Sequence, residues 1–186
     1  MKFNEPTMEN LVSSRKPFGL STTFHGRKEP KNGDIKIFEN QGVSYARRDE
    51  IPCNHSLIDQ YKVFIPRSSS GSDAFPHPIL GKPFVGKPGT ACSETYITIG
   101  PFKDEETCRN VISYIKTKFM RTLAMFKKVT QSTTKTLYTF VPVQNFSKPW
   151  TDKELYFKYG ISEDEIAFID SMIYPLEGDA KENAYL

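Results

Sequence analysis

The sequence DEETCRNVISYIKTKFMRTLAMF, residues 104–126, decides the fold class of this chain. Its apolar side chains recur every three or four positions: Cys108, Ile112, Ile115, Phe119, Leu123 and Phe126. This spacing predicts one long amphipathic helix that turns an apolar stripe toward a core. Asp104 is suited to cap its N-terminus, because a carboxylate can accept hydrogen bonds from the free N–H groups of the first turn.

A basic stripe runs beside the apolar one. Lys118, Arg121 and Lys128 fall within an arc of about 80° when the residues are placed at helical spacing. The predicted helix therefore buries one face and offers cations on the next.

The chain has no Asp or Glu in the 45 residues between Glu106 and Asp152. Eight cations stand in that segment: Arg109, Lys116, Lys118, Arg121, Lys127, Lys128, Lys135 and Lys148. Residues 1–106 carry a net charge of +1 and residues 152–186 one of −6, so the overall +3 hides a polarised molecule. A cationic surface without counter-charges attracts polyanions, and the polyanion we expect is nucleic acid.

The remaining pattern predicts a small mixed or antiparallel sheet. The strands are expected at residues 35–38 and 43–46, which form a hairpin, and at residues 61–65, 95–99 and 137–141. Residues 66–93 hold five Pro, four Gly and five Ser and are predicted to form a long loop. Short helices are predicted at residues 57–60 and 152–159, and a last helix begins at a capping box of Ser162 and Glu165. The expected class is α+β, with the long basic helix and a C-terminal helical pair.

With 186 residues, of which 38% are apolar, the chain can bury one core. We expect an N-terminal arm over residues 1–34, a domain over residues 35–176 and a flexible acidic tail over residues 177–186. No apolar run reaches the ~20 residues of a membrane span. The cysteines are three in number and widely spaced, which favours a reducing cytoplasm over a disulfide framework.

Sequence signals for catalysis are few. The chain has no Gly-x-Gly pair, which a dinucleotide or S-adenosylmethionine loop would use, and no Pro-Pro dipeptide of the kind that amino-methylating DNA methyltransferases use to hold a flipped base. We therefore expect no cofactor and no catalytic residue in this chain. The question of whether it is an enzyme stays open on one point, a nuclease site.

Two metal sites are conceivable from residue types alone. A zinc site would draw on Cys53, His55, His77 and Cys92, but these residues lack the paired spacing of structural zinc sites. A nuclease would need carboxylates, for which the candidates are Asp49, Glu50, Asp73 and Glu94. No lysine follows them at the spacing of a metal-nuclease signature, so a solvated acidic face is the preferred interpretation and no metal is expected.

The second half of the chain resembles a known family. Residues 113–121, SYIKTKFMR, fit a Y-x-x-T-K-F-x-R signature. Further matching segments follow in order: KVTQ at 128–131, FVP at 140–142, WTDKELY at 150–156, and YGIS at 159–162 with EIAFI at 165–169. Together with RKPFGL at 15–20, YKV at 61–63 and SETY at 93–96, they resemble the C-terminal region of adenine-specific DNA methyltransferases from type II restriction–modification systems, and the likeness extends from about residue 10 to residue 173.

In that family the region is similar to a target-recognition domain, which follows the catalytic domain, grips DNA and selects the sequence to be methylated. The resemblance therefore implies sequence-specific recognition of double-stranded DNA without catalysis, with a separate methyltransferase catalytic subunit as a second expected partner. The alternatives are a small restriction endonuclease and a protein-interaction subunit of a restriction–modification complex. The candidate DNA-binding residues are Lys116, Lys118, Arg121, Lys127, Lys128, Gln131 and Lys135. Gln131 is the candidate for reading adenine, because a side-chain amide can contact N6 and N7 together.

Overall fold

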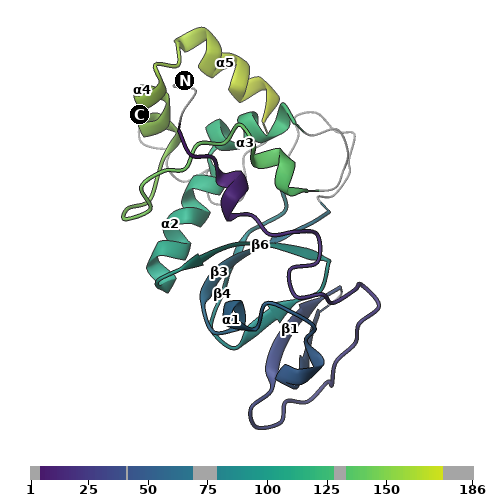
Figure 1. Ribbon diagram of the computed structural model, residues 1–186. Coiled ribbons are helices and arrows are strands. Elements are labelled where there is room, and N and C mark those ends of the chain that lie inside the picture. The colour runs from purple at the N-terminus through teal and green to yellow at the C-terminus, as the bar shows by residue number, and fades with distance from the viewer. Residues whose placement is uncertain (1–4, 41, 69–78, 128–132, 174–186) are drawn as a thin grey trace.

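The computed structural model describes residues 5–40, 42–68, 79–127 and 133–173. Two three-stranded sheets form the frame (Figure 1). One has the order β2-β1-β5, in which β1 (Ile35–Glu39) pairs antiparallel with β2 (Gly42–Ala46) and parallel with β5 (Thr90–Cys92). The other is antiparallel and has the order β4-β3-β6, with β4 at Phe84–Gly86, β3 at Tyr61–Pro66 and β6 at Tyr96–Phe102. The α+β class is confirmed.

The β4-β3-β6 sheet separates two hydrophobic cores. Side chains alternate between the faces of a strand, and the central strand β3 is apolar on both. Val63 and Ile65 enter the main core, whereas Phe64 enters the second core with the hairpin residue Ile37. All four side chains are fully buried, so the central strand is enclosed on both faces.

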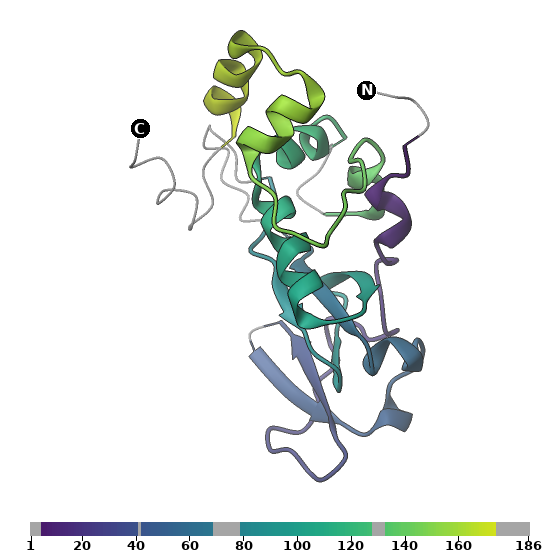
Figure 2. The ribbon, with the colours of Figure 1, turned by 90° about the vertical axis from the view of Figure 1, so that its left-hand side faces the viewer.

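Helices build the main core. α2 (Glu105–Lys116) covers one face of the β4-β3-β6 sheet (Figure 2), and α3 (Lys118–Met125), α4 (Asp152–Tyr159) and α5 (Glu163–Met172) gather at the end of the molecule away from β1 (Figure 1). Two 3₁₀ turns, η1 (Met8–Leu11) and η3 (Lys135–Tyr138), contribute Met8, Leu137 and Tyr138. The second core lies under the short elements η2 (Arg48–Glu50) and α1 (His55–Ile58).

The N-terminal segment belongs to both cores. Met8 and Val12 are buried in the main core, and Phe18 and Leu20 are buried in the second core. The first 34 residues therefore lie against the body of the molecule over much of their described length.

The prediction of a single long helix over residues 104–126 is wrong. The chain breaks at Thr117, whose backbone is extended (φ −61°, ψ 146°), so that α2 ends and α3 begins at the same residue. The Thr117 hydroxyl donates to the Tyr114 carbonyl and accepts from the Met120 N–H, and the Asp152 carboxylate accepts from the N–H groups of Lys118 (3.0 Å) and Phe119 (2.8 Å). Caps on both new helix ends replace the hydrogen bonds that the break removes.

Three other expectations change. Residues 137–141 form part of η3 and its exit and not a strand, because a short apolar run suits a buried helical turn equally well. β6 continues past Gly100 and Pro101 to Phe102, which an edge strand permits because proline removes only one N–H. Residues 66–93 contain β4 and β5, whose partners β3 and β1 lie elsewhere in the chain, while residues 69–78 fall outside the described part.

Local signals predicted several elements correctly. The hairpin of β1 and β2 and the strand β3 are confirmed. The C-terminal pair is confirmed as α4 and α5, each opened by a capping box, Thr151 with Glu154 and Ser162 with Glu165. Gly160 ends α4 in the left-handed conformation (φ 64°) that glycine adopts without strain.

Lys62 is a charged side chain inside this frame. It lies in β3, is fully buried, and directs Nζ at the carbonyl oxygens of Leu57 (3.0 Å), Ile58 (3.1 Å), Gln60 (3.0 Å) and Lys87 (3.3 Å). An ammonium has three N–H donors, so these carbonyls share them. One side chain thus ties the end of α1 and the β4–β5 turn to the central strand. Burial lowers the pKa of Lys62 to about 8, because desolvation outweighs the attraction of nearby acids.

Replacing Lys62 with Met should destabilise the fold by about 3 kcal/mol, because buried carbonyls lose their donor. The wild-type protein should also gain stability relative to Lys62→Met as the pH rises from 8 toward 10.5. In that window the unfolded lysine keeps its proton while the folded one releases it. Urea unfolding of both proteins at several pH values measures the difference, and a pH-independent difference would contradict the desolvated ammonium.

Burial also divides the cysteines. All three are free thiols; Cys53 is exposed, while burial raises the pKa of both Cys92 and Cys108 to about 12. Because the thiolate is the reactive form, a thiol reagent at pH 8 should modify Cys53 alone in the folded protein and all three cysteines in denaturant. Mass spectrometry of the labelled peptides checks this, and rapid labelling of Cys108 in the native state would show that the main core opens readily.

Candidate nucleic-acid interface

The predicted basic stripe is partly neutralised in three dimensions. Lys118 keeps only 17% of its side chain exposed and forms an ion pair of 2.5 Å with Asp170 of α5. Asp152, the first residue of α4, sits on the N-terminus of α3. The segment without acids in sequence therefore folds against acids that come later in the chain, and Lys118 is a weaker candidate for binding a polyanion than its position in the sequence indicated.

Arg121 lies inside the protein. Its side chain is fully buried, and its guanidinium donates to the Lys116 carbonyl (2.8 and 3.1 Å) and to the Thr117 carbonyl (3.2 Å). The Lys116 carbonyl is one that the break after α2 leaves without a backbone donor, while the Thr117 carbonyl also accepts the first backbone hydrogen bond of α3, from the Arg121 N–H at 3.2 Å. The expectation that Arg121 faces DNA does not hold in this structure, because the break at Thr117 turns α3 away from the line of α2.

Two of the predicted cations remain exposed and have no acidic partner among the described residues: Lys127, just after α3, and Lys135, which opens η3. Phe126, which precedes Lys127 in sequence, is 63% exposed, and Phe140 is 43% exposed with the centre of its ring 4.8 Å from Lys127 Nζ. We call these four residues the α3–η3 surface. Lys128 and Gln131, which fall between them in sequence, lie outside the described residues.

The α3–η3 surface adjoins the roots of two loops. The Thr133 N–H donates to the Arg67 carbonyl at 2.6 Å, and the Arg67 N–H donates to the Thr95 carbonyl at 2.8 Å. The chain leaving β3 and the chain entering η3 are therefore hydrogen-bonded side by side. The loops expected to approach DNA bases, within residues 66–93 and at residues 131–135, start from one place although about 65 residues of sequence separate them.

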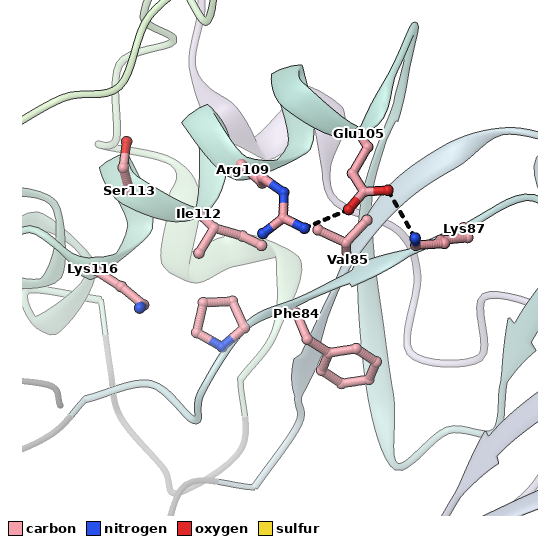
Figure 3. Close-up of a pocket in the computed structure, with 9 residues that line it drawn as sticks. Phe84, Val85, Lys87, Glu105, Arg109, Ile112, Ser113 and Lys116 are labelled. Atoms are coloured by element: carbon pink, nitrogen blue, oxygen red, sulfur yellow. Dashed lines mark hydrogen bonds and ion pairs between the residues drawn. The ribbon is translucent and has the colours of Figure 1, made fainter. Parts of the chain in front are cut away.

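A cleft between α2 and β4 was missed by the sequence analysis. It has a volume of about 550 Å³ and contains the side chains of Lys87, Arg109 and Lys116 around Val85 and Ile112 (Figure 3). Lys116 was predicted as a binding residue, but Arg109 and Lys87 were not. The available signal was the spacing of Arg109, Ile112 and Lys116, which places them on one face of a helix; Lys87 comes from a distant segment and carried no such signal.

An acid partly balances the cleft. Glu105 accepts from Arg109 at 2.5 Å and pairs with Lys87 at 2.9 Å. Hydrogen bonds from Lys87 and Arg109 hold the pKa of Glu105 below its usual value, so its carboxylate is ionised at neutral pH. Lys116 has no ion-pair partner in the described part of the chain, and the three cations exceed the single acid by two charges.

The candidate nuclease and zinc residues that the structure describes do not form a metal-binding cluster. Among residues 5–40, 42–68, 79–127 and 133–173, no three His, Cys, Asp or Glu side chains come together in a way that could hold a metal ion. Asp49 and Glu50 pair with arginines, Cys92 is buried, and Cys53 is exposed. His77 and Asp73 lie outside the described residues.

Glu94 is held by a network of its own. It is nearly buried and accepts from Arg15 (3.1 Å) and from the Thr22 N–H (3.3 Å), with Lys16 at 3.9 Å. Burial opposes its ionisation, but the Thr22 N–H and the nearby cations more than compensate and lower the pKa of Glu94. Its contacts fasten the N-terminal segment to the start of β6.

Comparison of the chain with models of known protein families, with curated proteins and with solved structures finds no match. Within the described residues, no helix is long and apolar enough to cross a membrane. The α3–η3 surface and the α2–β4 cleft are therefore the features from which function is inferred.

Replacing Arg121 with Met should lower the unfolding free energy by about 2–3 kcal/mol, because charge-assisted hydrogen bonds to two buried carbonyls are removed. Arg109→Met is the matched control, since Arg109 is exposed and its ion pair with Glu105 is a surface pair that contributes little to stability. Thermal unfolding of both variants measures the contrast. Equal melting temperatures would show that the guanidinium of Arg121 does not support the break between α2 and α3.

Proposed function

We propose that this chain is a DNA-binding target-recognition domain, or a fragment of one, from a restriction–modification adenine methyltransferase. It recognises duplex DNA and has no catalysis of its own. The observation that carries this proposal is the α3–η3 surface, where exposed cations without acidic partners among the described residues lie at the joint root of two loops. The likeness of residues 113–169 to the C-terminal region of such methyltransferases supports the same function.

The charges of this surface suit a phosphate backbone. An exposed lysine that lacks an acid keeps its full attraction for a polyanion, and binding releases condensed counterions from the DNA. Lys127 and Lys135 frame the sequence positions of Lys128 and Gln131, so phosphate contacts at the two ends would hold the intervening residues over the duplex. Gln131 is our candidate for contacting adenine.

The exposed phenylalanines fit this role. Phe126 and Phe140 leave large apolar side chains exposed to water, which does not stabilise the folded protein. Exposed apolar patches often mark interaction sites. Against DNA they would pack on deoxyribose or on unstacked bases, as apolar side chains of DNA-bending proteins do. The cation over the Phe140 ring keeps a positive charge beside this apolar contact.

A second candidate function is supported by a different surface. Phe157 on α4 and Phe168 on α5 are 91% and 54% exposed. Phe168 lies between Glu165 and Asp170 in sequence, whereas Phe157 is followed by Lys158. A protein-interaction subunit would bury these side chains against a partner, for which we propose a methyltransferase catalytic subunit. The two functions are compatible, because the aromatic residues of α4 and α5 and the α3–η3 surface use different residues. We place the protein in the cytoplasm, where its three free thiols stay reduced.

The DNA-binding proposal predicts how affinity depends on salt. Fluorescence anisotropy with a labelled duplex of about 30 base pairs should give a linear decrease of log affinity with log salt concentration. In Lys127→Ala/Lys135→Ala the magnitude of that slope should fall by about 1.8, which is about 0.9 for each phosphate that the variant no longer neutralises. The melting temperature should not change, because both side chains are exposed.

The matched control is Lys28→Ala/Lys31→Ala, which removes the same charge from two exposed positions near the β1 end of the molecule. It should keep the wild-type slope. Failure of the wild-type protein to bind any duplex at low salt would overturn the DNA-binding function, and equal slopes in the two double variants would remove the α3–η3 surface from it.

A further inference from the structure

The α2–β4 cleft is an open depression in which cations outnumber acids among the described residues. It is bounded by α2 on one side and by β4 and the β4–β5 turn on the other (Figure 3). Arg109 and Lys116 are seven residues apart on α2, so their backbones lie about 10 Å apart along the helix axis. Each strand of a duplex carries one phosphate for about every 3.4 Å of helix axis, so two cations at this separation can contact two different phosphates of one strand.

The cleft combines charge with an apolar wall. Val85 and Ile112 lie among the charged side chains in Figure 3, and both are half-buried. A deoxyribose–phosphate chain has the same alternation, since apolar sugar carbons separate its anionic phosphates. An acidic peptide would also pair with the cations, but its charged side chains would make fewer apolar contacts with Val85 and Ile112 than deoxyribose would.

We propose that this cleft binds the phosphodiester backbone of the same DNA, with Arg109 and Lys116 contacting phosphates and with sugars against Val85 and Ile112. This inference rests on the proposed DNA-binding function and assigns it a second contact region. The cleft and the α3–η3 surface are connected through the chain, because Lys116 ends α2 and α3 leads directly to Lys127.

Glu105 then acts as an internal substitute for a phosphate. Its two carboxylate oxygens hold Lys87 and Arg109 in the absence of DNA, at 2.9 and 2.5 Å. Exposed ion pairs of this kind contribute little to stability, so a phosphate can compete for the same donors at small cost. The carboxylate also weakens binding, because its negative charge opposes each arriving phosphate.

Three variants test this assignment with the duplex and anisotropy measurement used above. Arg109→Ala/Lys116→Ala should reduce the magnitude of the salt slope by about 1.8, while Lys28→Ala/Lys31→Ala should not change it. Glu105→Gln should increase the affinity several-fold at low salt, because it removes the opposing charge and keeps the shape of the side chain. Ethylation of single phosphates should identify positions that weaken wild-type binding but no longer weaken binding of Arg109→Ala/Lys116→Ala.

The outcomes separate this inference from the function on which it rests. If the wild-type protein binds DNA and responds to Lys127→Ala/Lys135→Ala but not to Arg109→Ala/Lys116→Ala, the cleft is not a backbone site and the DNA-binding function stands. An unchanged or lower affinity of Glu105→Gln would also overturn the inference, since a phosphate in the cleft must gain from removal of that charge. If the wild-type protein binds no duplex at all, both the function and the cleft assignment fail.

Discussion

The enclosure of β3 on both faces is the constraint on which the rest of the structure depends. A strand that sends Val63 and Ile65 into one core and Phe64 into the other requires a covering layer on each side, and α2 and the β1–β2 hairpin supply those layers. The buried ammonium of Lys62 adds a polar requirement, since the end of α1 and the β4–β5 turn must bring carbonyl oxygens to it. The candidate interface is attached to this enclosed strand, because β3 leads directly to Arg67, whose carbonyl accepts a hydrogen bond from the Thr133 N–H.

The break at Thr117 determines how the charges of the basic segment are distributed. A continuous helix would carry Arg121 along the line of Lys118, whereas the break turns Arg121 inward to the carbonyls that end α2. The same turn brings α3 against α5, so that Lys118 meets Asp170. An acid-free stretch of sequence is therefore an incomplete guide to an acid-free surface: the charges of segments that pack together have to be counted in space.

Elements with strong local signals were predictable from the sequence, and elements that depend on distant partners were not. The capping boxes at Thr151 and Ser162 and the β-branched run of β3 act within a few residues, and each is found where it was expected. The three-residue strands β4 and β5 exist only because β3 and β1 offer edges to them, and no periodicity in three residues could reveal this. The same limit applies to the candidate site, where exposed Lys127 could be expected from its segment but the meeting of Lys87 with Arg109 through Glu105 could not.

The acidic C-terminal helices set a boundary for the proposed DNA contact. Glu163, Asp164 and Glu165 form the first turn of α5, where their negative charges interact favourably with the positive end of the helix dipole. Asp152 and Asp170 neutralise the side of α3 that faces α4 and α5. A phosphate backbone approaching that end would meet uncompensated carboxylates and be repelled, whereas one lying over Lys127 and Lys135 or along the α2–β4 cleft meets an excess of cations. In the proposed complex, repulsion at this end would restrict how a duplex can lie, so the acids that weaken the basic stripe would also contribute to the orientation of the DNA.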